Sequence, residues 1–256
     1  MIDTKTISQL RAQTGAGMME CQQALTEANG DINQAVEVLR KKGAIKAAKK
    51  ADRATKEGVI AIKIAPDHKQ GTLVAINCET DFVAKNSDFS SFVSELATKE
   101  DAEAEFNSRK EDLILKIGEN LTFGTAQTLA AEYVTGYLHA NKQAASLVAF
   151  NKALPETLAY DIAMQIVAGQ PLYLQPADVP ADVLAKEKEV YAEQLKNEGK
   201  PEAVWEKIIV GKLNKYYEDT CLLNQRFIKD EEKTITQLLK AAGDDVTIVK
   251  FVRYQI

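Results

Sequence analysis

Few side chains in this sequence have the type and spacing that catalysis or metal binding requires. The chain has two histidines, His68 and His139, and three widely separated cysteines, Cys21, Cys78 and Cys221. It contains no Gly-x-Gly-x-x-Gly, Gly-Lys-Ser or Gly-Lys-Thr sequence that would bind phosphates. These residues assemble no catalytic site, metal site or disulfide framework. We therefore expect a protein that is not an enzyme, needs no cofactor, and keeps its cysteines reduced and mostly buried.

One short stretch, residues 77–89, stands out against this background. The segment before it, 72–76, is rich in β-branched and apolar residues, which indicates a strand. After it, apolar residues recur at the spacing of one helix face, at Phe89, Phe92, Val93 and Leu96. We therefore expect a strand-to-helix corner at residues 80–85, with Ser87 capping the helix that follows.

Phe82 is the unusual residue of this corner. Thr80 and Asp81 favour turns and helix caps, whereas a large aromatic ring is not expected in a turn. Phe82 either packs beneath the corner, as apolar side chains usually do, or is held out for contact with another molecule. The residue types alone leave both interpretations open.

Composition sets the class of protein. With 256 residues, 45% of them hydrophobic and 27% charged, the chain is typical of a soluble globular protein with more than one domain. No apolar run is long enough to cross a bilayer, and no signal peptide is apparent, so we expect a cytoplasmic protein. The net charge of −5 argues against a dedicated nucleic-acid binder.

The periodicity predicts an ordered series of domains. Residues 1–43 indicate three short helices, 44–57 a basic and partly helical linker, and 58–131 a first core subdomain of strands and helices. Residues 132–178 and 222–256 indicate a second core subdomain, and 179–221 an inserted antiparallel helical hairpin.

Caps, helix stops and paired faces are predicted at defined positions. Capping boxes are expected at Thr6 with Gln9, at Asp31 with Gln34 and at Ser108 with Glu111. Helix stops are expected at Gly15, Gly30 and Gly43. In the hairpin, we expect one apolar face to pack on another: Val183, Leu184, Val190, Tyr191 and Leu195 against Val204, Ile208, Ile209 and Leu213.

Several of these segments together resemble one family. The matching motifs are Thr80-Asp81-Phe82-Val83 continuing as Ala84-Lys85-Asn86, Leu10-Arg11, residues 14–19, Ala24-Leu25, residues 116–120, and residues 161–168 followed by Pro171 and Tyr173-Leu174. In this order and spacing they are similar to bacterial elongation factor Ts, over nearly the whole chain. The chain departs from the family pattern in lacking arginines at 121–125, in lacking Gly-Arg after His139, and in ending at Ile256, where the family often continues into a short helix.

The resemblance implies a fold and a function. The fold is α+β, with an N-terminal ubiquitin-associated-like domain of three helices, a core of two subdomains with antiparallel sheets, and an inserted coiled-coil hairpin. The function is that of a translation elongation factor. It associates with elongation factor Tu, both GDP-bound and nucleotide-free, and promotes exchange of GDP for GTP by displacing Mg²⁺ and the nucleotide. The resemblance also implies no membrane, no specific nucleic acid, and a possible dimer or 2:2 complex.

It also implies roles for individual residues. Phe82 would enter an apolar pocket beside the partner's nucleotide site and Asp81 would disturb the Mg²⁺ shell, while Thr80 and Val83 would shape the tip. Arg11, Met18 and Met19 would form a second contact surface on the N-terminal domain, and His139 is a further contact candidate. The plainer interpretation of Met18 and Met19 is that at least one of them fills the three-helix core.

Two functions of other classes remain open from the sequence. The N-terminal helices would suit an adaptor that binds a peptide or ubiquitin-like partner. The basic segment 44–57 would suit an RNA-binding accessory protein, although it lacks the interleaved aromatic residues on which bases stack.

Overall fold

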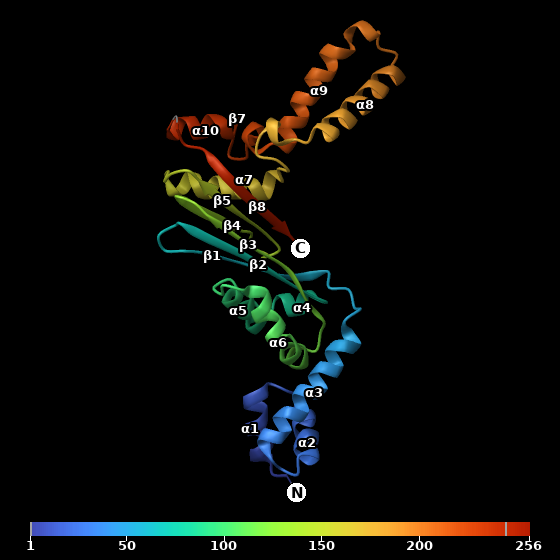
Figure 1. Ribbon diagram of the computed structural model, residues 1–256, viewed down its shortest axis with the longest axis vertical. Helices are drawn as coiled ribbons and strands as arrows, with labels where there is room; N and C mark the ends of the chain where they lie inside the picture. Colours follow the sequence, from blue (N-terminus) through green and yellow to red (C-terminus); the bar gives the residue numbers. More distant parts are fainter. Residues whose placement is uncertain (1, 244) are drawn as a thin grey trace. The chain divides into compact units, whose positions relative to one another are not determined.

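The computed structural model describes residues 2–243 and 245–256, and its chain forms two compact units (Figure 1). The first unit comprises residues 2–63, 73–127 and Ile256, and the second comprises residues 64–72 and 128–255. Within the described residues, no helix combines the length and the apolar character needed to cross a membrane. The expected α+β fold is confirmed.

The N-terminal part of the first unit is the expected three-helix arrangement. Its helices are α1 (Thr4–Thr14), α2 (Met18–Glu27) and α3 (Ile32–Lys50). Their apolar faces meet in one buried cluster that contains Leu10, Cys21, Leu25 and Leu39. Leu115 from helix α6 (Ala102–Ile117) completes this cluster, so the three helices do not build their core alone.

Two predicted features of these helices are wrong. Asp3, and not Thr6, caps α1, because its carboxylate accepts from the Thr6 amide at 2.6 Å and the helix begins earlier than expected. Gly43 does not end α3, which continues to Lys50. A Cβ atom at Gly43 would lie 3.3 Å from the backbone oxygen of Glu111, so the glycine allows α3 to pack closely on α6. The predicted caps at Asp31 and Gly15 are confirmed.

The rest of the first unit is a three-stranded sheet and the helices packed on it. The strands β1 (Glu57–Ile64), β2 (Gln70–Cys78) and β3 (Leu121–Ala130) pair in the order β1-β2-β3. Helix α4 (Asp81–Ala84) follows β2, and α5 (Ser87–Leu96) and α6 (Ala102–Ile117) come before β3. The predicted apolar face of α5 is fully confirmed, since Phe89, Phe92, Val93 and Leu96 are all buried against this sheet.

Two helix starts in this region differ from prediction. Asn86, and not Ser87, caps α5, because its side-chain oxygen accepts from the amides of Asp88 and Phe89. Helix α6 begins at Ala102 behind the cap Asp101, so Ser108 lies inside the helix and caps nothing. The charged stretch before Ser108 is thus helical, and its Phe106 is buried in the core.

The second unit contains an antiparallel sheet of β4 (Tyr133–Leu138), β5 (Ala144–Phe150) and β8 (Ile248–Gln255). Tyr133 pairs with Phe150, which confirms the predicted hairpin of β4 and β5. Helices α7 (Glu156–Gly169) and α10 (Ile235–Ala242) share a core with this sheet. The short elements of this unit are η1 (Pro176–Asp178), η3 (Leu222–Asn224), β6 (Arg226–Phe227) and β7 (Asp230–Thr234).

The helical hairpin of the second unit consists of α8 (Ala181–Asn197) and α9 (Trp205–Thr220), with the short turn η2 (Glu202–Val204) before α9 (Figure 1). Leu195 and Leu213 are buried between its helices as predicted. Val190 and Val204, predicted to lie on the two apolar faces that pack against each other, are exposed. Because two helices that pack only on each other bury a narrow strip of each apolar face, the residues at the edges of that face stay exposed.

The three cysteines are free and buried, as the sequence predicts. In the described part of the chain, no group of three or more His, Cys, Asp and Glu side chains is arranged to hold a metal ion.

Candidate partner-binding site

The corner predicted after β2 is present, and its local sequence explains how it forms. Thr80 has extended backbone angles, and its hydroxyl accepts from the amide of Val83 at 3.4 Å, which starts α4. The amide of Lys85 donates to the carbonyl of Asp81 at 2.9 Å, which closes this single helical turn. Asn86 then starts α5, so the chain changes direction between two capped helices.

The apolar side chains of α4 point in opposite directions. Val83 and Ala84 pack against the core cluster of the first unit. Phe82, between Asp81 and Val83, is 82% exposed. The interpretation of Phe82 as a core residue is therefore wrong, and its ring is available to another molecule. Because several other large apolar side chains of this chain are also exposed, exposure alone does not identify a contact site, and the contact role of Phe82 stays a prediction.

Asp81 carries the negative charge beside this ring. Lys85 donates to its carboxylate at 2.6 Å, one helical turn away. This hydrogen bond and the lysine charge lower the pKa of Asp81, and Asp81 in turn raises the pKa of Lys85. Asp81 is therefore ionised at neutral pH, and its carboxylate only accepts hydrogen bonds.

A second carboxylate, that of Glu119 just beyond the C-terminal end of α6, binds the backbone of the corner. Glu119 accepts from the amides of Glu79 and Thr80 at 3.1 and 3.0 Å through Oε2. Its Oε1 accepts from the Thr80 hydroxyl at 2.5 Å. In the opposite direction, the Glu79 carboxylate accepts from the amide of Asn120 at 2.6 Å. Residues 79–80 and 119–120 are thus joined by hydrogen bonds in which each segment supplies both donors and acceptors.

Cys78 supports the corner from inside the core. Its thiol is fully buried and donates to the carbonyl of Thr80 at 3.2 Å. Burial, with a smaller effect from the charges of Glu119 and Glu57, raises the pKa of this thiol to about 12. The group therefore stays protonated and acts as a hydrogen-bond donor.

The second predicted surface lies where α1 ends and α2 begins. Arg11 is exposed in the last turn of α1, and Met18 and Met19 are 53% and 75% exposed at the start of α2. The interpretation that one of these methionines fills the three-helix core is therefore wrong. Exposed methionines suit adaptable protein contacts, and a contact role for Arg11, Met18 and Met19 stays a prediction.

His139 lies in the second unit, directly after β4, and is exposed. Its Nδ1 is 3.1 Å from the hydroxyl of Tyr137, and the Tyr137 ring packs edge-on against Tyr160. These three side chains form a small aromatic group on the surface of that unit. The geometry assigns His139 no chemical role, and its part in a contact stays a prediction.

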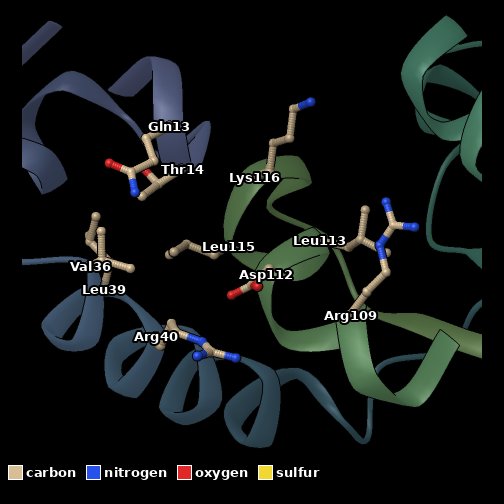
Figure 2. A pocket seen from close by; sticks show the side chains of 10 residues that line it. All are labelled: Gln13, Thr14, Val36, Leu39, Arg40, Arg109, Asp112, Leu113, Leu115 and Lys116. Atoms are coloured by element: carbon tan, nitrogen blue, oxygen red, sulfur yellow. The ribbon is translucent and has the colours of Figure 1, made fainter. Parts of the chain in front are cut away.

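A hollow of about 430 Å³ lies within the first unit, between α1, α3 and α6 (Figure 2). Its apolar lining includes Val36, Leu39 and Leu115, and its charged rim includes Arg40, Arg109, Asp112 and Lys116. Arg109 and Lys116 already form ion pairs with Glu95 and Asp88. We interpret the hollow as the seam where α3 packs on α6.

The sequence identified Thr80, Asp81, Phe82 and Val83 but missed the residues that hold them. Cys78 and Glu119 bond to Thr80, while the Glu79 side chain accepts from Asn120, and Glu119 is 39 residues from Thr80 along the chain. The only signal was that residues 116–120 match a family motif, which by itself predicts a helix end. No local rule connects that helix end with the corner.

Comparison with known proteins agrees with this architecture. A family model described as "Elongation factor TS" matches residues 79–256, and one described as "UBA-like domain" matches residues 1–46. The chain is 41% identical to elongation factor Ts of Nitratiruptor sp. and 43% identical to that of Nautilia profundicola, over 100% of this chain and 93% and 92% of those proteins. It is 41% identical to elongation factor Ts of Chloroherpeton thalassium, over 98% of that protein.

Proposed function

Because the chain belongs to the elongation factor Ts family, we propose that it binds elongation factor Tu and promotes exchange of GDP for GTP on that partner. The observation that carries the proposal is the exposed Phe82 on a corner that hydrogen bonds hold in place. An ordered apolar tip with an adjacent carboxylate is suited to enter a site on another protein.

The proposed action is thermodynamic coupling without covalent chemistry. A protein that releases GDP from its partner must bind the nucleotide-free state more tightly than the GDP-bound state. Linkage makes this effect reciprocal, so GDP must weaken the complex by the same factor. GTP then binds the vacated site, and the exchange factor leaves.

The corner supplies two groups for this coupling. We propose that the Phe82 ring enters an apolar pocket beside the nucleotide and that Asp81 disturbs the coordination of Mg²⁺ there. Asp81 is suited to this because it is ionised and its carboxylate is held at the tip by Lys85. Loss of Mg²⁺ leaves the charge of the diphosphate uncompensated and so weakens the binding of GDP.

Thr80 and Val83 act on the geometry of the tip. Thr80 caps α4, and Val83 fixes the turn to the core. We propose that Arg11, Met18 and Met19 bind a separate area of the same partner, because these side chains are exposed on one helix–turn–helix. A dimer or a 2:2 complex is a prediction that light scattering of the purified complex measures directly.

The test is release of a fluorescent GDP analogue from elongation factor Tu. We expect the wild-type protein to accelerate release and Phe82→Ala to lose most of the acceleration at an unchanged melting temperature. Leu172→Ala removes another exposed apolar side chain and serves as the matched control, with full activity expected. If the wild-type protein does not accelerate release, the proposed function is wrong.

The role of Asp81 is tested in the same assay with and without Mg²⁺. We expect Asp81→Asn to slow release when Mg²⁺ is present and to match the wild-type protein when EDTA has removed it. A defect of equal size under both conditions would show that Asp81 acts on something other than the metal ion.

A further inference from the structure

The orientation of the corner depends on few local interactions. Helix α4 is four residues long, and its one side-chain cap is the 3.4 Å bond from the Val83 amide to the Thr80 hydroxyl. So short a helix has little stability of its own. The direction in which Phe82 projects is therefore set from outside the helix, by the packing of Val83 on the core and by what holds the chain as it enters α4.

Glu119 supplies that restraint. Its carboxylate accepts from two consecutive amides, those of Glu79 and Thr80, and from the Thr80 hydroxyl. These groups immediately precede Asp81 and Phe82, so they fix the backbone from which α4 starts. Charge-assisted hydrogen bonds of this kind are stronger than neutral ones.

Glu119 is itself held in place. It directly follows Gly118, which ends α6 in the left-handed conformation at φ 87°. The next residue, Asn120, is buried and donates through Nδ2 to the carbonyl of Arg53 at 2.9 Å. Its amide donates to the carboxylate of Glu79 at 2.6 Å. The carboxylate of Glu119 therefore projects from a fixed turn of backbone.

We propose that Glu119 is a positioning residue for nucleotide exchange, which it serves by holding the backbone of Glu79 and Thr80 so that Phe82 and Asp81 present to the partner. The inference rests on the proposed function for its consequence, but the restraint on the corner is a property of this chain alone. Exchange activity and corner rigidity are therefore measured separately.

The chain offers graded variants. Glu119→Ala removes all three acceptor contacts. Glu119→Gln keeps the shape, because its amide oxygen accepts from the two backbone amides and its amide nitrogen donates to the Thr80 hydroxyl oxygen. Thr80→Val has nearly the same volume but loses the hydroxyl, and with it both the bond to Glu119 and the cap on the Val83 amide. Glu111→Ala removes an exposed carboxylate from α6, the helix that ends just before Glu119, and is the matched control.

The first experiment measures hydrogen exchange of the isolated protein. In Glu119→Ala we expect the amides of Glu79 and Thr80 to exchange at least tenfold faster. We expect the buried amides of β2, such as Ile76, to keep their rates, and Glu111→Ala to resemble the wild-type protein. Unchanged exchange at Glu79 and Thr80 would overturn the proposal, whether or not the protein acts on elongation factor Tu.

The second experiment is a double-mutant cycle on release of fluorescent GDP. We expect Glu119→Ala to reduce acceleration by roughly tenfold or more, since displacement of a contact group by about 1 Å can cost on the order of a hundredfold in rate. Thr80→Val should give a smaller loss, and Glu119→Gln should retain most of the activity.

Non-additivity separates positioning from general damage. If Glu119 acts through the tip, Glu119→Ala adds little to a chain that already carries Phe82→Ala and Asp81→Asn. An equal further loss in that background would overturn the proposal. If the wild-type protein fails to accelerate release, the proposed function falls, and the hydrogen-exchange result still decides whether Glu119 holds the corner.

Discussion

The corner at residues 79–85 and the N-terminal turn at residues 14–20 both expose large apolar side chains, but different kinds of contact hold them in place. Each presents large apolar side chains to solvent at the start of a helix, Phe82 on α4 and Met18 with Met19 on α2. The N-terminal turn is held mainly by neighbours along the chain. The Gly15 amide donates to the carbonyl of Arg11 at 2.8 Å, and the Gly17 amide donates to the carboxylate of Glu20.

The corner depends on distant residues instead. Its backbone amides donate to Glu119, and its own Glu79 accepts from Asn120, about 40 residues away in sequence. A helix of ten residues such as α2 needs only local bonds at its start, because its buried face already fixes it to a core. A single turn such as α4 must be held from outside.

The largest expected effect contrasts two phenylalanines of the corner region. Phe89 is fully buried, so Phe89→Ala should lower the free energy of unfolding by about 3–5 kcal/mol. Phe82→Ala should change it by less than about 0.5 kcal/mol, because its ring is exposed. Urea denaturation of both variants measures this. A substantial loss of stability in Phe82→Ala would contradict the exposed orientation of the ring.

The same contrast applies to the N-terminal helices. Leu25→Ala should cost about 2–5 kcal/mol because it empties a buried position of α2. Met19→Ala should leave stability within about 0.5 kcal/mol and weaken the complex with elongation factor Tu. Denaturation and calorimetric titration test the two halves of this prediction. Unchanged affinity in Met19→Ala would remove that residue from the contact surface.

A smaller effect tests the local restraint of the N-terminal turn. Gly15 has φ 69°, in the left-handed region, so Gly15→Ala should cost about 1–2 kcal/mol. Gly17 has φ −61°, and a Cβ there would have only ordinary contacts. Gly17→Ala is therefore the unstrained control and should cost about 0.5 kcal/mol, because Ala is a poorer N-cap residue than Gly. Equal melting temperatures of the two variants would contradict the role of the left-handed turn.

The smallest effect concerns the pH dependence of the corner. Burial raises the pKa of Cys78 from 9.0 to about 12 in the folded chain. Its contribution to stability is therefore fully present below pH 9.0 and is lost as the pH rises toward 12. We expect the melting temperature of the wild-type protein to fall relative to Cys78→Ser between pH 8 and about pH 10.5. Cys21 and Cys221 are present in both the wild-type protein and Cys78→Ser, so their effect on the difference in melting temperature largely cancels. Curves of melting temperature against pH that run parallel for the two proteins would contradict the raised pKa of Cys78.

Much of this protein follows from local sequence. The spacing of Phe89, Phe92, Val93 and Leu96 determined the buried face of α5, and Asp31 determined the start of α3. Thr80 determined where the corner turns, since its side chain caps α4 directly. These features depend on residues within one or two helical turns of each other, which is the range over which periodicity and capping act.

Only the tertiary structure decided which segments distant in sequence contact each other. The direction of Phe82 could not be predicted, because a Phe in a turn is equally compatible with the core and with solvent until Val83 is seen to occupy the core. Nothing in the sequence indicated that Glu119 binds the corner. Gly43 was predicted to end a helix, whereas it lies within α3 where that helix packs on α6. Each of these depends on contacts between residues far apart in sequence, and such contacts exist only once the chain has folded.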